Sequence, residues 1–139
     1  MILKEYIWTA LVTAGIVVLS TIPIPEHPPL GDVPLMDKWV HMVMYAGVVF
    51  VMWIDHVVRN RRTFSWAARI VMLLYAIALG GAMELVQAYL TTCRSGDWID
   101  WEADAVGALA GKLLCALLNM KFKAKQHHKA EQISSYNKE

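Results

Sequence analysis

The fold class is decided by residues 66–90, which read WAARIVMLLYAIALGGAMELVQAYL. The only fully charged side chains in this run are Arg69 near its start and Glu84 near its end. A transmembrane helix needs about 20 predominantly apolar residues to cross a hydrocarbon core about 30 Å thick. Residues 66–90 meet that length, so we predict that they cross a membrane as one helix.

Three further apolar runs accompany this segment and comprise residues 6–24, 38–58 and 98–120. Only 18% of the 139 residues are charged, whereas soluble domains average roughly 25%. The connections between the runs are short, which favours antiparallel neighbours. We therefore predict an all-α membrane protein. Residues 1–120 should form an antiparallel bundle of four transmembrane helices, and residues 121–139 a polar, basic tail.

The first run can also be read as a signal peptide, because Lys4 precedes it and residues 18–20 form a weak cleavage site. The run is longer than an ordinary signal-peptide core, and no Ala-x-Ala sequence follows it. We therefore expect it to be retained as a membrane anchor.

Positive side chains predict the orientation of the bundle. They gather between the second and third runs and after the fourth: Arg59, Arg61, Arg62, Arg69, Lys121, Lys123, Lys125 and Lys129. The positive-inside rule places these segments in the cytoplasm, and four spans then place both chain ends there. Asp55 is expected to pair with Arg59, four residues later. The net charge of +1 argues against a nucleic-acid partner, which would require a basic surface.

Ionisable side chains recur inside the apolar runs, near their outer ends. Asp37, His41 and Tyr45 follow one another at intervals of four residues, which places them on one face of the second helix. Glu84 and Asp104 each lie about six residues from the outer end of their helix, hence roughly 9 Å deep. An ionisable group at mid-membrane costs at least about 2.5–3.5 kcal/mol, so each needs a partner or a water-filled cavity. We therefore predict a polar site near the outer face.

The chemistry of these groups suits two kinds of site. His41 either makes a hydrogen bond to a neighbouring helix or acts as a general acid or base oriented by Asp37. His41, Glu84 and Asp104 are also suitable donors for a divalent cation. The sequence leaves open whether a metal ion binds.

Arg94 lies in the connection between the third and fourth helices. It either pairs with Asp97 or Asp100 or binds a phosphate or carboxylate of a ligand through its planar guanidinium. Gln87 shares a helix face with Glu84, so we expect it to face the same site.

Small residues predict how the last two helices pack. Ala103, Gly107 and Gly111 form a small-xxx-small pattern that lets two helices approach closely. Gly80 and Gly81 on the third helix are the expected counterparts, and such packing would hold the acidic residues of the two helices together. The same face could serve oligomerisation, so a homo-oligomer is an alternative.

The polar motifs stand in a fixed order along the chain: Asp37-Lys38-x-x-His41-x-x-x-Tyr45, Glu84-x-x-Gln87 and Arg94-x-x-Asp97-x-x-Asp100-x-x-x-Asp104-x-x-Gly107-x-x-x-Gly111. In this order and spacing they resemble the VanZ-like family, small membrane proteins named after a teicoplanin-resistance accessory protein. The family commonly has Asn at the position of Asp104, and a carboxylate there favours a coordinating or proton-holding role. The resemblance implies a four-helix protein of the bacterial cytoplasmic membrane, linked in some members to lipoglycopeptide susceptibility.

Three functions fit these predictions. The first is binding of a membrane lipid or lipid-linked cell-wall intermediate, with an effect on teicoplanin susceptibility. The second is a membrane hydrolase or transferase that acts on a lipid head group by acid–base or cation-assisted chemistry. The third is a structural subunit of an envelope complex. The predicted catalytic residues are Glu84, His41, Asp37 and Asp104, and the predicted ligand-binding residues are Arg94, Gln87, Asp100, Tyr45 and Asp97.

Overall fold

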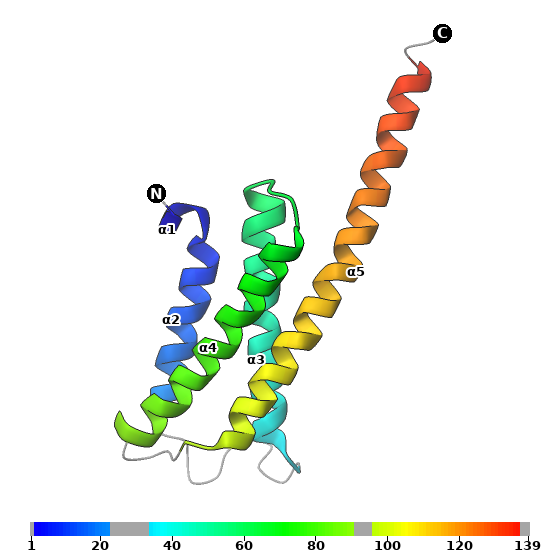
Figure 1. The fold of residues 1–139 in the computed structure, drawn as a ribbon. Helices are drawn as coiled ribbons and strands as arrows, with labels where there is room; N and C mark the ends of the chain where they lie inside the picture. The colour runs from blue at the N-terminus through cyan, green and yellow to red at the C-terminus, as the bar shows by residue number, and fades with distance from the viewer. Residues whose placement is uncertain (1, 23–33, 91–95, 137–139) are drawn as a thin grey trace.

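The structure is a computed structural model that describes residues 2–22, 34–90 and 96–136 (Figure 1). The elements in these ranges are α1 (Ile2–Glu5), α2 (Ile7–Thr21), α3 (Met36–Trp53), the π-helical segment η1 (Ile54–Arg59), α4 (Trp66–Leu90) and α5 (Trp98–Tyr136). Because η1 continues α3 without a break, the bundle has four main helices. The predicted all-α class is confirmed for the described residues.

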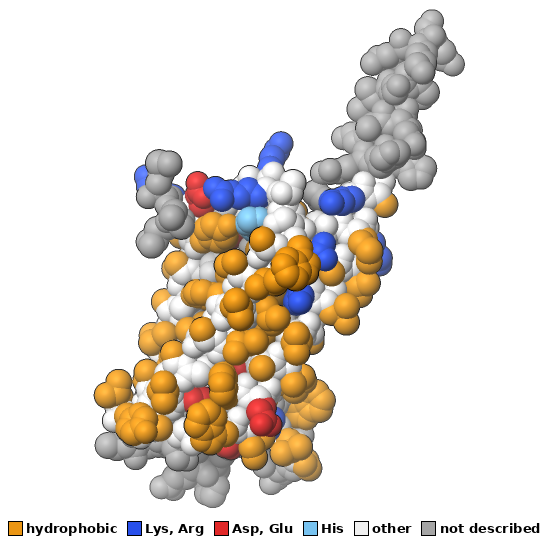
Figure 2. All heavy atoms as spheres, in the orientation of Figure 1, with side chains coloured by type: hydrophobic (Ala, Val, Ile, Leu, Met, Phe, Trp, Pro, Cys, Tyr) orange, Lys and Arg blue, Asp and Glu red, His pale blue; other side chains and the backbone are white. Residues whose placement is uncertain are grey.

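Three of these helices are long and apolar enough to cross a membrane: Met36–Arg59, Trp66–Leu90 and the Trp98–Lys125 part of α5. Large apolar side chains such as Val43, Val71 and Leu113 are exposed on the helix surfaces. Figure 2 shows hydrophobic side chains covering the flank of the bundle. An apolar surface of this extent suits lipid rather than water. The chain is therefore a small helical membrane protein.

The N-terminal apolar helix is shorter than predicted. α2 contains 15 residues, which at 1.5 Å per residue gives about 22 Å, less than a hydrocarbon core of about 30 Å. It ends at Thr21 because Ile22 precedes Pro23 and is extended (φ −74°, ψ 137°), as steric clash with a proline ring favours. The helix predicted over residues 6–24 is thus confirmed only over Ile7–Thr21. Full-span length is confirmed for the other three helices.

The last helix is much longer than predicted. It begins at Trp98, as expected, but runs to Tyr136 rather than to residue 120. The sequence beyond Gly111 contains no glycine or proline, and it is rich in the good helix formers Lys, Ala, Gln and Glu. The 39 residues of α5 extend about 58 Å. Figure 1 shows α5 continuing well past the ends of the other helices.

The main helices run alternately up and down, as predicted for an antiparallel bundle. In Figure 1, α1, the connection from η1 to α4 and the far half of α5 lie toward one end. We call this the arginine end, because η1 ends at Arg59 and the connection that follows carries Arg61 and Arg62. The first turns of α3 and α5 lie at the opposite end, which we call the acidic end for Asp37, Asp97, Asp100 and Asp104.

α3 and α5 form the most extensive helix pair, and glycine makes their close approach possible. A Cβ atom added at Gly107 would overlap the backbone of Met42, and one added at Gly111 would lie 2.7 Å from the carbonyl oxygen of Ala46. These glycines were predicted to face the third transmembrane helix, residues 66–90, which is α4. That prediction is wrong, because they face α3, which is the second of the four main helices. The small-residue stripe therefore joins the second and fourth main helices.

At the arginine end, Asp55 holds the start of α2 against the neighbouring helix. Oδ2 of Asp55 accepts hydrogen bonds from the backbone N–H and the hydroxyl of Thr9, both at 2.9 Å. This N–H is one of the first four in α2, which have no carbonyl partner within their own helix. Asp55 is completely buried, so it caps α2 from outside. The predicted pair with Arg59 is present, at 3.7 Å between Nη1 and Oδ1.

Further polar contacts join the N-terminal residues to η1 and its connection. The hydroxyl of Tyr6 lies 2.7 Å from Nδ1 of His56. Nδ2 of Asn60 donates to the backbone oxygen of Glu5 at 2.8 Å, and Arg62 pairs with the Glu5 carboxylate at 2.6 Å. α1 and the arginine-rich connection are therefore held together at this end.

Candidate functional site

Three helices bring His41, Glu84 and Asp104 together at the acidic end. One donor atom from each, a ring nitrogen or a carboxylate oxygen, lies within 4.8 Å of the other two. Nδ1 of His41 and Oδ1 of Asp104 are joined by a hydrogen bond of 2.8 Å. We call these residues the carboxylate–histidine cluster. The similar depth that the sequence predicts for these residues thus corresponds to proximity in space.

Asp104 is completely buried, and α4 leaves room for it. A Cβ atom added at Gly80 would lie 2.6 Å from Oδ2 of Asp104, so a glycine is needed opposite this carboxylate. Oδ2 is buried and has no hydrogen-bond partner among the residues that the structure describes. Because an unpartnered buried polar atom is energetically costly, Asp104 is a strong candidate for a functional residue.

Glu84 joins the cluster to the beginning of α5. The residue is only 9% exposed to solvent. Its Oε2 accepts a hydrogen bond from the backbone N–H of Asp97 at 2.7 Å. The other oxygen, Oε1, is buried and has no hydrogen-bond partner in the described ranges. Each acid of the cluster therefore has one engaged oxygen and one without a partner.

Lys38 organises the remaining acidic side chains. Its ammonium group pairs with Asp37 at 2.8 Å, with Asp97 at 3.0 Å and with Asp100. The N–H of Ile99 and the ammonium of Lys38 hold the pKa of the Asp97 carboxyl below its usual value. Sequence reasoning missed the role of Lys38. The available signal was a single lysine among several carboxylates at the predicted outer face.

The prediction that Asp37 orients His41 is wrong. The side chain of Asp37 is 60% exposed and pairs with Lys38, whereas Asp104 makes the hydrogen bond to His41. The second ring nitrogen of His41, Nε2, lies 4.0 Å from Asp100. Two aspartates of α5 therefore flank the imidazole, in place of the one on its own helix.

Gln87, Tyr45 and Arg94 were also predicted to bind a ligand. Gln87 is buried and donates from Nε2 to the backbone oxygen of Ser20 at 3.2 Å, so it holds α4 against α2. Tyr45 is almost completely buried, one helical turn from His41. Arg94 lies outside the described residues, so its anion-binding role stays a prediction.

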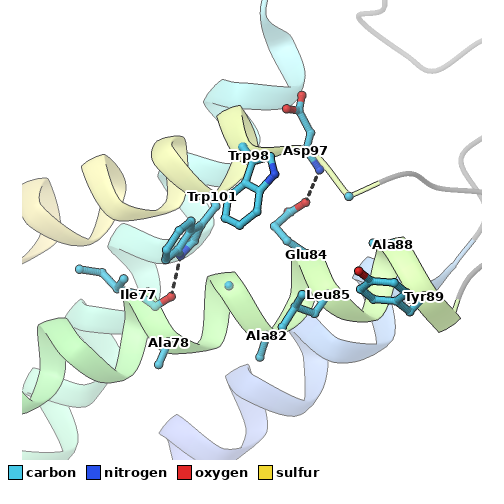
Figure 3. A pocket seen from close by; sticks show the side chains of 12 residues that line it. Ile77, Ala78, Ala82, Glu84, Leu85, Ala88, Tyr89, Asp97, Trp98 and Trp101 are labelled. Atoms are coloured by element: carbon cyan, nitrogen blue, oxygen red, sulfur yellow. Dashed lines mark hydrogen bonds between the residues drawn. The ribbon is translucent and has the colours of Figure 1, made fainter.

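A groove of about 490 Å³ lies beside the cluster, between α4 and the start of α5 (Figure 3). Its walls are mostly apolar and consist of Ile77, Ala78, Gly81, Ala82, Leu85, Ala88, Tyr89, Trp98 and Trp101. Glu84, Gly96 and Asp97 line its polar part, where Figure 3 shows the hydrogen bond between Glu84 and Asp97. A volume of several hundred Å³ is typical of small-molecule sites.

Trp101 holds one wall of this groove in place. Its Nε1 donates to the backbone oxygen of Ile77 at 3.0 Å, and a Cβ atom added at Gly81 would lie 3.2 Å from the same nitrogen. Trp98 lies beside it, with ring centroids 5.5 Å apart. The sequence predicted neither residue as part of a site. Their spacing of three residues on one helix face was the only signal.

Comparison of the chain with protein-family models, with curated proteins and with solved structures finds no match. The resemblance to the VanZ-like family therefore rests on the order of the polar motifs and stays a prediction. The site consists of an acid–base or cation-binding cluster that Glu84 joins to an apolar groove.

Proposed function

We propose that this protein binds a membrane lipid or a lipid-linked cell-envelope intermediate. The head group would lie at the carboxylate–histidine cluster and an acyl chain in the groove. The observation that carries this proposal is that Glu84 belongs to both features. A lipid presents a polar head joined directly to an apolar chain, and the site presents a polar cluster joined directly to an apolar groove.

The surroundings of the groove support a lipid rather than a water-soluble ligand. Trp98 is 74% exposed and Tyr89 is 80% exposed, and aromatic side chains of this kind gather where a membrane meets water. Leu85 and Ala82 on the α4 wall are exposed on the apolar flank of the bundle. An acyl chain can therefore enter the groove sideways from the bilayer.

The distribution of charge supports an orientation with the acidic end outside a bacterial cytoplasmic membrane. Figure 2 shows Lys and Arg side chains mostly toward the arginine end and Asp and Glu mostly toward the other, and positive residues favour the cytoplasmic side. Green fluorescent protein fused to the C-terminus is therefore expected to fluoresce, and alkaline phosphatase fused there to be inactive. The reverse pattern would place the groove in the inner leaflet.

Lipid binding also provides a physical route to the drug susceptibility that resemblance to the VanZ-like family implies. A protein that holds a lipid-linked cell-wall intermediate reduces the access of a glycopeptide to its membrane-proximal target. Membership of that family is part of the proposal, and the order and spacing of the polar motifs support it.

A second candidate function is an enzyme that acts on the same lipid, and one contact favours it. His41 and Asp104 are in direct contact at 2.8 Å, with Glu84 in the same cluster. An imidazole between carboxylates can transfer a proton to or from a bound head group. In this function Glu84 is the general base, and Glu84→Gln should fold normally and lose turnover.

Lipid retention tests the proposal directly. Wild-type protein, incubated with a bacterial lipid extract and repurified in mild detergent, is expected to retain one class of lipid, measured by mass spectrometry. Ala82→Trp places an indole on the groove wall and should lower retention roughly tenfold, equivalent to about 1.4 kcal/mol of binding free energy. Ala67→Trp is the matched control, because it adds the same bulk to an exposed position at the other end of α4.

The outcomes separate the three functional hypotheses. Equal retention by Ala82→Trp and wild type would remove the groove from the lipid site. Consumption of a lipid by wild type but not by Glu84→Gln would establish the enzyme. A protein that neither retains nor consumes any lipid would leave the polar cluster with a structural role.

A further inference from the structure

The carboxylate–histidine cluster has the composition of a metal site, and we propose that it binds one divalent transition-metal ion, such as Mn²⁺ or Zn²⁺. His41, Glu84 and Asp104 come from α3, α4 and α5, and each offers one donor atom within 4.8 Å of the others. Metal bonds of about 2.0–2.2 Å place two ligand atoms at most about 4.4 Å apart. Small side-chain rotations would therefore bring all three donors onto one ion.

Two buried oxygen atoms provide independent support for a ligand. Oε2 of Glu84 accepts from the N–H of Asp97, and Oδ1 of Asp104 is hydrogen-bonded to Nδ1 of His41. The second oxygen of each acid, Oε1 and Oδ2, is buried without a hydrogen-bond partner in the part of the chain that the structure describes. Buried polar atoms are normally satisfied by protein or by a bound species. A metal ion would satisfy both atoms at once.

The local charge balance also favours a cation. The described acidic residues at this end are Asp37, Glu84, Asp97, Asp100, Glu102 and Asp104, and the described basic ones are Lys38 and His41. Lys38 is already paired with Asp37, Asp97 and Asp100, and Glu102 is exposed. The carboxylates of Glu84 and Asp104 face only His41 among the described cationic groups. Buried charges are stable when they are paired, protonated or bound to a metal.

The donor set indicates the class of ion. Ca²⁺ prefers six to eight oxygen ligands and Mg²⁺ prefers an oxygen octahedron with several waters, whereas imidazole with carboxylates suits first-row transition metals. Three protein ligands leave positions open for water or another ligand, as in catalytic metal sites. If the lipid proposal holds, an ion here would also bind a lipid phosphate, which the acids alone would repel. The metal site itself does not depend on that proposal.

Binding of Mn²⁺ to the purified full-length protein, stripped with a chelator and without added lipid, tests the inference. Electron paramagnetic resonance should show saturable binding of one ion per chain, with modulation from an imidazole ¹⁴N nucleus in pulsed spectra. Glu84→Gln and Asp104→Asn should weaken binding at least about tenfold, because even second-layer groups commonly contribute that much. Asp37→Asn is the matched control: it removes the same charge from an exposed side chain outside the cluster.

Each outcome decides the inference. Nitrogen modulation in wild type, lost in His41→Gln and preserved in Asp37→Asn, would support it. Absence of saturable Mn²⁺ binding to folded wild-type protein would overturn it. Binding without nitrogen modulation, or binding that Asp37→Asn weakens as much as Asp104→Asn, would also overturn it. The wild-type spectrum remains decisive where a cluster variant does not fold, and neither result depends on lipid retention.

Discussion

Gly107→Ala is expected to separate α3 from α5 and to prevent formation of the site. The added Cβ would overlap the carbonyl oxygen of Met42 and would lie 2.6 Å from its Cα. These are backbone atoms, which cannot rotate away, so the two helices must move apart. Overpacking of this kind typically costs about 1–3 kcal/mol or more, which exceeds the gain of about 1 kcal/mol from replacing glycine by alanine in a helix. Thermal unfolding in detergent, followed by circular dichroism, should show a lower midpoint.

Gly47→Ala is the control for this prediction. Gly47 lies within α3, and a Cβ added there would meet nothing within 4 Å. Helix propensity alone then applies, so Gly47→Ala should leave the midpoint unchanged or raise it. Met42, which the added Cβ would overlap, directly follows His41 in the chain. Gly107→Ala should therefore reduce Mn²⁺ binding as well. Equal midpoints for the two alanine variants would show that α3 and α5 are not in close contact at Gly107.

Asp55→Ala is expected to destabilise the protein and to release α2 from the bundle. Without the carboxylate, the N–H and hydroxyl of Thr9 lose their shared acceptor, and each unsatisfied buried donor costs about 1–3 kcal/mol. The attraction between a negative charge and the helix N-terminus is lost as well. Hydrogen exchange followed by mass spectrometry should show faster exchange across α2, and thermal unfolding should show a lower midpoint.

Two variants separate this helix capping from a general loss of polar contacts. Asp55→Asn retains an oxygen that can accept from Thr9, so its effect should be smaller than that of Asp55→Ala. Thr13 also lies in α2, and its hydroxyl makes an exposed hydrogen bond with Tyr75 of α4. Thr13→Val removes this bond and should have little effect. Exchange across α2 that is no faster in Asp55→Ala than in Thr13→Val would show that Asp55 does not hold this helix.

The positions of several helix boundaries were predicted correctly from the local sequence. Residues 66–90 form α4 as predicted, and α5 starts at Trp98 as predicted. Apolar length accounts for these segments, because every backbone polar group in lipid must be satisfied within a helix. Two predicted helix ends were wrong: α2 already stops at Thr21, because Ile22 precedes Pro23, and α5 does not stop where its apolar run ends.

The three residues of the carboxylate–histidine cluster were predicted from the sequence, but the pairing within the site was not. Glu84 and Asp104 were predicted at similar depth, because depth depends only on the rise per residue of a helix. Which residue faces His41 depends on the rotation of each helix about its own axis. Packing against all neighbouring helices sets that rotation. Asp104 therefore took the place that spacing alone assigned to Asp37.

The sequence by itself determined the membrane class, the existence of three long spans and the set of polar residues near one end, because hydrophobic length and helical rise are properties of the chain alone. Only the tertiary structure decided that Gly107 faces α3, that Lys38 pairs with three aspartates and that Glu84 joins the cluster to a groove. These features arise between residues distant in the chain. They depend on how closely two helices approach, and close approach is a property of the assembled bundle.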